Sequence, residues 1–158
     1  MAKQIVVNTG PLIALERMGC LDVIGALPFQ YLYPEEVRSE ISAGVQKGHP
    51  SIAPSWIECR ALSTNPTPFG VVGLDVGETA VIQLALELSI PAVAIDEWKG
   101  RRMALALGLK VTGSLGLLAK AKQYGLIPAL KPLIEKAELT GIRYHPKLVA
   151  ALLREIGE

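Results

Sequence analysis

The stretch from Leu74 to Leu118 constrains the fold more than any other part of this chain. Asp75 and Glu78 stand three residues apart just before an apolar run, a spacing that has the form of a capping box and predicts the start of a helix. Pro91 to Ile95 is then a continuous apolar run, too short for a helix and typical of a strand buried on both faces. This strand ends at Asp96, so a capped helix leads directly into a buried strand, as in an α/β fold.

The residues after Asp96 continue this alternation. Residues 98–107 predict a helix that ends at Gly108, and residues 109–112 predict another strand. Ser114 is expected to cap the helix that follows that strand. In an open parallel sheet, ligands bind beyond the carboxyl ends of the strands. We therefore expect Asp96 and the turn before this last helix to share one rim of the sheet.

A second strand end of the same kind lies near the N-terminus. Gln4 to Val7 is a short β-branched run that ends at Asn8, and Pro11 stands in the first turn of a helix that continues to Met18. If both strands are parallel, Asn8 and Asp96 should lie side by side. Taken alone, Asn8 could also be an ordinary Asx turn or helix cap.

Short helices and strands alternate through the rest of the chain. Further helices are expected at 20–27, from Pro34 onward, and at 115–124, 127–139 and 146–156; further strands are expected at 29–33, 56–62 and 141–144. We interpret the Gly-, Pro- and Ser-rich segment 44–73 as an excursion at the sheet edge, with a mobile loop at 66–70. This alternation predicts one α/β domain over residues 1–158, a three-layer α/β/α sandwich around a central, mostly parallel sheet.

Composition excludes several classes of protein. No apolar stretch reaches the roughly 20 residues of a membrane-spanning helix, and the N-terminus lacks a signal peptide's apolar segment. We therefore expect a cytoplasmic protein that does not associate with a membrane. Sixteen basic and fifteen acidic residues leave no global charge for nucleic-acid binding. Half of the residues are apolar, which favours a buried sheet and a homodimer or higher oligomer. Cys20 and Cys59 lack neighbouring ligand residues and are interpreted as buried thiols.

The polar candidates at the predicted rim are acids and one amide. No phosphate loop, nucleophile elbow, HExxH or GxGxxG motif is complete, and His49 and His145 lack an evident partner and are interpreted as surface or turn residues. Oxygen ligands at strand ends suit Mg²⁺ or Mn²⁺. The candidates are Asn8, Glu40, Glu78 and Asp96, with Glu97 in reserve.

Several of these residues also have ordinary interpretations. Glu40 could reach the rim from its helix or could face solvent. In a complete capping box, the Glu78 carboxylate reaches back to the Asp75 N–H; if Asp75 alone caps the helix, Glu78 is free to face the rim. Three cations at the start of the helix after Asp96 could bind substrate phosphates or could be solvated. They are Lys99, Arg101 and Arg102.

Four segments, in this order and spacing, carry a family pattern over nearly the whole chain. They are IVVNTGPLIAL, YPEEVRSEI, LDVGETAVIQLALE and AVAIDEWKGRRMALALGLKVTGSLGLLAKAKQYGLI. Together they resemble a PIN-like domain of the prokaryotic type, closest to a branch related to toxin nucleases of toxin–antitoxin pairs. In that branch GE opens the central helix and Asn often replaces the first acid. The resemblance implies an α/β/α sandwich whose acids bind Mg²⁺ or Mn²⁺ and hydrolyse phosphodiesters, usually of RNA.

Carried over by position, the resemblance implies roles for individual residues. The four main positions, predicted to be catalytic, fall on Asn8, Glu40, Glu78 and Asp96, and accessory positions fall on Glu97 and Arg101. Metal ligation is predicted for Asn8, Glu78, Asp96 and Glu97, and substrate binding for Lys99, Arg101 and Ser114. Members with a full acid set have Asp where this chain has Asn8, which offers an oxygen without a charge. Two hypotheses remain: a metal-dependent endoribonuclease, which could be a toxin neutralised by an antitoxin, or a PIN-like module that binds RNA or a protein without cleavage.

Overall fold

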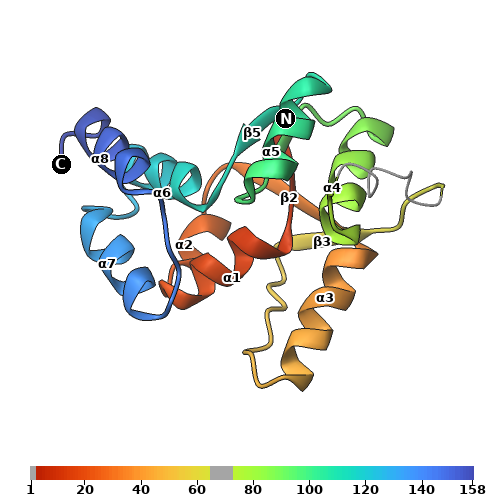
Figure 1. The fold of residues 1–158 in the computed structure, drawn as a ribbon, viewed down its shortest axis with the longest axis horizontal. Helices are drawn as coiled ribbons and strands as arrows, with labels where there is room; N and C mark the ends of the chain where they lie inside the picture. The colour runs from red at the N-terminus through yellow and green to blue at the C-terminus, as the bar shows by residue number, and fades with distance from the viewer. Residues whose placement is uncertain (1–2, 65–72) are drawn as a thin grey trace.

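A five-stranded sheet lies at the centre of the computed structural model, which describes residues 3–64 and 73–158 (Figure 1). The strands are β1 (Lys3–Val7), β2 (Phe29–Pro34), β3 (Ile57–Arg60), β4 (Ala92–Ala94) and β5 (Lys110–Thr112). Their order is β3-β2-β1-β4-β5, and every neighbouring pair is parallel. The chain moves outward from β1 through β2 to β3 and then returns to β4 on the other side of β1. This reversal places the crevice of the sheet beyond the carboxyl ends of β1 and β4.

Helices connect the strands and cover the sheet. They are α1 (Thr9–Arg17), α2 (Leu21–Gly25), α3 (Glu35–Gln46), α4 (Val76–Glu87), α5 (Trp98–Ala106), α6 (Ser114–Gln123), α7 (Lys131–Leu139) and α8 (Pro146–Glu155). α4 packs against β1, β2 and β4 and also contacts α5, whereas α1 and α2 contact α6. In Figure 1, α4 lies on one side of the strands and α1, α2 and α6 lie on the other. The predicted α/β sandwich with a parallel central sheet is confirmed.

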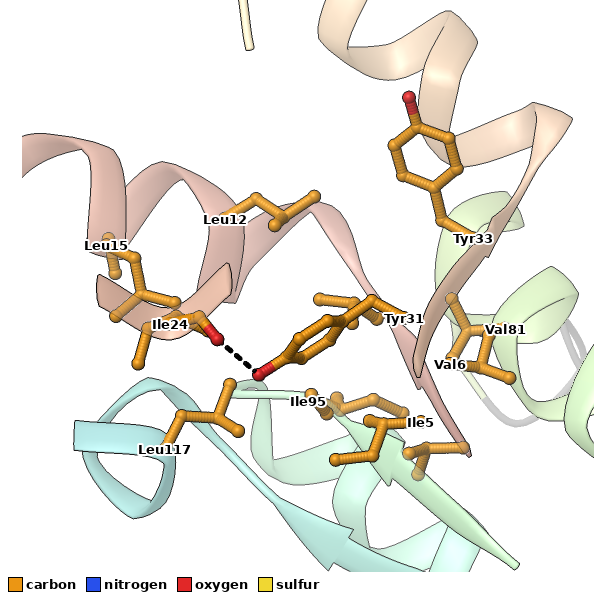
Figure 2. Packing of buried hydrophobic residues seen from close by; sticks show 14 of the residues in the cluster. Ile5, Val6, Leu12, Leu15, Ile24, Tyr31, Tyr33, Val81, Ile95 and Leu117 are labelled. Atoms are coloured by element: carbon orange, nitrogen blue, oxygen red, sulfur yellow. Dashed lines mark hydrogen bonds between the residues drawn. The ribbon is translucent and has the colours of Figure 1, made fainter. Parts of the chain in front are cut away.

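The hydrophobic core occupies both faces of the sheet, because the strands are apolar on both sides (Figure 2). Tyr31 of β2 is 1% exposed and lies near side chains of α1, α2 and α6. Its hydroxyl donates to the carbonyl of Ile24 at 2.8 Å, so this buried phenol is satisfied. Val6 of β1 lies beside Val81 of α4. Packing on both faces holds β1 firmly, and with it the residue that follows β1.

The predicted elements are confirmed in order, with three corrections. α7 begins at Lys131 rather than at residue 127, after an irregular segment that contains Pro128. Residues 141–144 form no strand. Ser114 is the first residue of α6 rather than its cap, because Gly113 holds the N-cap position. The predicted loop at 66–70 lies outside the described residues.

Two further expectations concern membranes and thiols. Within the described ranges, no helix is both long enough and apolar enough to cross a membrane. Both cysteines are free thiols; Cys20 is buried, as expected, whereas Cys59 is only partly buried.

Candidate active site

Asn8 follows β1 directly, at the point where the strand order reverses. Its backbone N–H donates to the carbonyl of Ala94 at 2.9 Å, which joins the end of β1 to the end of β4. Asn8 holds the N-cap position of α1, but its side chain makes no capping hydrogen bond. The side-chain oxygen Oδ1 is buried and has no hydrogen-bond partner among residues 3–64 and 73–158. Helix capping therefore does not explain this side chain, and the oxygen is available to a ligand.

Glu78 lies in the first turn of α4 and is 5% exposed. The capping box is complete: the Glu78 N–H donates to Asp75 Oδ1 at 2.7 Å, and the Asp75 N–H donates to Glu78 Oε1 at 3.4 Å. The box thus occupies only one carboxylate oxygen, through a long hydrogen bond. The other, Oε2, is buried without a partner in the described part of the chain. It meets α5 at Gly100, where any Cβ would collide with it.

The environment of Glu78 makes ionisation costly. Burial and then the neighbouring charge of Asp75 raise the pKa of Glu78 to about 7, and Glu97 contributes a smaller effect in the same direction. A positive ligand beside the unpaired oxygen of Glu78 would offset this cost, because a nearby cation stabilises the ionised carboxylate. Such shifts are common at functional sites.

Asp96 follows β4 by two residues and is held in place by α6. Oδ1 accepts a hydrogen bond from the Ser114 N–H at 2.8 Å, and Oδ2 accepts one from Ser114 Oγ at 2.9 Å. Burial raises the pKa of Asp96, while these two hydrogen bonds and the charge of Arg101 lower it. Gly113 lies so close to Oδ1 that a Cβ there would collide with it. Asp96 and the turn before α6 thus share one rim, as the sequence indicates.

Tyr144, which the sequence analysis missed, extends this contact to the C-terminal part of the chain. Its hydroxyl lies 2.6 Å from Ser114 Oγ. Because Ser114 has one hydroxyl proton and donates it to Asp96, Tyr144 must donate to Ser114. Burial raises the pKa of Tyr144 to about 12, so the phenol keeps its proton. The hydroxyl of Ser114, predicted to bind substrate, therefore contacts Asp96 and Tyr144.

Glu40 lies where α3 meets the starts of α1 and α4. Its Oε2 accepts a hydrogen bond from Thr9 Oγ1 at 2.7 Å, and a Cβ added to Gly77 would collide with its Oε1 as the side chain now lies. Burial is the main cause that raises the pKa of Glu40; Thr9 opposes it. Glu40 is therefore not a solvated helix residue. Thr9 is a second contact that sequence reasoning did not identify.

Residues 8–10 connect these separate contacts. Asn8 provides the free amide oxygen, Thr9 binds Glu40, and a Cβ on Gly10 would lie 4.0 Å from Cβ of Asp96. Glu78 reaches the start of α5, four residues beyond Asp96 in the sequence. These contacts link the four main candidates to the segments that follow β1 and β4.

The cationic candidates lie on α5. Arg101 Nη1 donates to the Ile95 carbonyl at 2.8 Å, which fixes its guanidinium next to Asp96. Lys99 is exposed, and its Nζ would lie 3.3 Å from a Cβ on Gly73. Glu97 is exposed at the N-cap of α5.

The donor chemistry of the site fits a hard divalent cation in part. Among the described residues, no three His, Cys, Asp or Glu side chains form a ready metal-binding group. Asn8 offers an oxygen without a charge, and both oxygens of Asp96 accept hydrogen bonds from Ser114. Asn8 Oδ1 and Glu78 Oε2 are nevertheless buried oxygens without donors. Mg²⁺ prefers oxygen ligands and keeps several waters, so few protein ligands suffice.

The chain is an α/β domain with a parallel sheet. Its candidate site is lined by acidic and amide oxygens where the strand order reverses, and cationic side chains lie beside it. A family model described as a PIN domain matches residues 4–158, and the chain belongs to this family. A sequence comparison with curated proteins found no match. The domain is therefore a nuclease-like module, as the resemblance of the four segments indicates.

Proposed function

We propose that this protein is a divalent metal-dependent endoribonuclease that hydrolyses RNA phosphodiesters. The observation that carries the proposal is the pair of buried oxygens without donors, Asn8 Oδ1 and Glu78 Oε2, in a nuclease-like domain. Leaving a buried polar group unsatisfied costs about 1–3 kcal/mol. Two such oxygens that lack donors are suited to a cation.

The residues that would hold Mg²⁺ or Mn²⁺ are Asn8, Glu78 and Asp96, with Glu97 available from the exposed side. When bound, such an ion neutralises phosphate charge and makes water more acidic. Asn8 supplies no charge, so Glu78 and Asp96 provide the negative charge within the buried part of the site.

The remaining side chains orient the reactants. Glu40 keeps a raised pKa through burial and is fixed by Thr9, so it can orient a water or accept its proton. Arg101 carries its charge next to Asp96, where it can bind a phosphate oxygen of the RNA. Ser114 and Tyr144 act through Asp96 by fixing the direction of its carboxylate.

The proposal includes a toxin of a toxin–antitoxin pair that acts in the cytoplasm. The GE sequence at the start of α4 and Asn8 at the first main position support this branch of the family. Large apolar side chains that remain exposed support a partner, either a second copy or an antitoxin. They include Val76, Leu105, Leu139 and Leu148.

A second candidate function is an RNA- or protein-binding module that does not cleave. The amide at Asn8 favours it, because the site lacks one charge against a divalent ion.

Hydrolysis of a single-stranded RNA in Mn²⁺, Mg²⁺ or EDTA separates the two functions. A ribonuclease cleaves RNA only with the ion and loses this cleavage in Glu78→Gln. The matched control is Glu135→Gln on α7, far from Glu78 along the chain, which should cleave as the parent does. RNA that is bound but stays intact with every ion supports the binding module. Cleavage that persists in EDTA and in Glu78→Gln comes from a contaminating nuclease and removes the support for the proposal.

A further inference from the structure

The first turn of α5 carries an exposed aromatic side chain next to the candidate active site. Trp98 is 67% exposed and follows Asp96 by two residues. Tryptophan is usually well buried on average, so an indole that remains open at the edge of a site is available to a ligand. The other tryptophan, Trp56, is partly buried, and its ring packs against Tyr31 with centroids 5.0 Å apart.

Cations accompany this indole on α5. The Arg102 guanidinium lies 5.9 Å from the Trp98 ring centroid, which is a cation–π contact. Lys99 is the next residue and is exposed, and Arg101 is fixed beside Asp96 through the Ile95 carbonyl. The opposing charge on the exposed side of this turn is Glu97. An exposed indole with several neighbouring cations is complementary to a nucleobase and its flanking phosphates.

We propose that Trp98 is a stacking platform for one nucleobase of a single-stranded RNA, with Lys99 and Arg102 binding the adjacent phosphates. The inference rests on the proposed function, because it concerns the substrate of the same site. Stacking on an aromatic side chain tolerates every base, but it requires a base whose face is free. In a duplex the base faces are covered by their neighbours, so this platform selects single strands over duplexes.

A protein partner is the competing occupant of this face. Leu105 is 59% exposed and stands two turns beyond Trp98, on the same side of α5. A partner helix would need both apolar side chains, whereas a nucleotide needs Trp98 and the cations. The charges on Lys99 and Arg102 favour the nucleotide, and Leu105→Ala serves to separate the two occupants.

The first experiment uses indole fluorescence. Trp56→Phe leaves Trp98 as the only tryptophan of a chain that has two. This variant is titrated with a single-stranded RNA oligonucleotide in EDTA, so that ion-dependent cleavage does not occur. We expect saturable quenching by the single strand and little change with a duplex of the same length. Fluorescence that stays unchanged while a labelled single strand binds, as followed by anisotropy, would overturn the inference.

The second experiment measures RNA affinity in otherwise unchanged protein. Trp98→Ala should weaken binding of the single strand about 5- to 100-fold, and Trp98→Phe should retain most of the affinity. Tyr124→Ala, which removes another exposed aromatic side chain at the end of α6, is the matched control and should bind as the parent does. Equal affinity of Trp98→Ala and the parent would refute the platform. If Trp98→Ala and Leu105→Ala instead change the mass in light scattering and leave RNA affinity unchanged, the face is a protein interface.

These outcomes distinguish the inference from the proposed function. If RNA stacks on Trp98 but is not cleaved with any ion, the ribonuclease proposal fails and the stacking platform stands. If cleavage depends on the ion and kcat/KM is equal in Trp98→Ala and the parent, the ribonuclease proposal stands and the stacking platform fails.

Discussion

The hydroxyl of Tyr144 lies 2.6 Å from Oγ of Ser114, although 30 residues separate them in the chain. Ser114 in turn donates to Asp96, so the irregular segment before α8 contributes to the position of a candidate catalytic acid. The segment between α7 and α8 is therefore connected to the site through a short series of hydrogen bonds.

Tyr144→Phe tests this connection. The variant keeps the ring and loses one hydrogen bond, which should lower the free energy of unfolding by about 1 kcal/mol. Ser114 can still donate to Asp96, so cleavage should fall several-fold without being abolished. Thermal melts and cleavage rates measure both effects, with Tyr124→Phe as the control. A variant that matches the parent in both would show that Ser114 alone fixes Asp96.

Asp96→Asn should abolish ion-dependent cleavage while leaving the fold intact. The amide oxygen can still accept the hydrogen bond from the Ser114 N–H, so the turn before α6 should survive. Because Asn8 is already neutral, the central set of four has at most three carboxylates, and removing one takes away a large share of the charge that attracts a divalent ion. Circular dichroism checks the fold, and a Mn²⁺ titration of cleavage checks the site. Retained cleavage with an unchanged titration would move the site elsewhere.

Much of this site could be predicted from the sequence, because it depends on local patterns. The capping box at Asp75, the apolar run before Asp96 and the strand that ends at Asn8 each specify an element and its end within a few residues. Parallel neighbours then bring Asn8 and the end of β4 together. The fold class and the PIN-like family follow from these patterns, and both are confirmed.

The rest depends on contacts between distant residues that no local pattern reveals. Thr9 binds Glu40 across 31 positions, and Tyr144 reaches Ser114 from a segment whose predicted strand was wrong. Ser114 has a hydroxyl of the type that caps helices, but tertiary contacts direct it to Asp96 instead. The metal ligands, the RNA and the partners stay predictions.

The pH dependence of stability should depend on Glu78. The pKa of Glu78 is about 7 in the folded protein, compared with the ordinary value of 4.5 expected in the unfolded chain. The folded state therefore retains the proton to a higher pH. Stability in EDTA should therefore fall as pH rises from about 4.5 to 7, with no contribution from Glu78 below that window. Glu78→Gln keeps an oxygen for the Asp75 N–H and removes this ionisation.

Melts of Glu78→Gln and the parent in EDTA at several pH values make the comparison. The variant should match the parent near pH 4 and should be more stable at pH 7 to 8. A residual slope is expected in both, because burial also raises the pKa of Glu40 and of Asp96. If the stability profiles of the two proteins are parallel, burial does not raise the pKa of Glu78.

The assembly prediction is a homodimer or a higher oligomer. Half of the residues are apolar, and large apolar side chains remain exposed on several helices, including Leu105 of α5 and Leu139 of α7. Association would bury such surface. Light scattering at tens of micromolar should give at least twice the chain mass of 16.9 kDa. A monomer would refute this prediction and would leave the apolar surface for a different partner.

The last prediction concerns Asn8, which offers the proposed metal site an oxygen without a charge. Asn8→Asp is nearly isosteric, so packing should change little, but it places a negative ligand at the end of β1. In a metal-free site this buried carboxylate is costly, because burial and the neighbouring acids oppose its ionisation. The melting temperature in EDTA should therefore fall below that of the parent.

Supplying Mn²⁺ should reverse this loss. An ion that binds the folded state stabilises it more the more tightly it binds, so the variant should gain more in melting temperature than the parent and should cleave RNA faster. Gln46→Glu adds the same charge at an exposed position of α3 and controls for net charge. The Asn8 side chain does not cap α1 in the structure, so an exchange of one cap for another cannot explain such shifts. If Asn8→Asp and Gln46→Glu respond alike to EDTA and Mn²⁺, no ion binds at the end of β1, and the binding module becomes the better account of this domain.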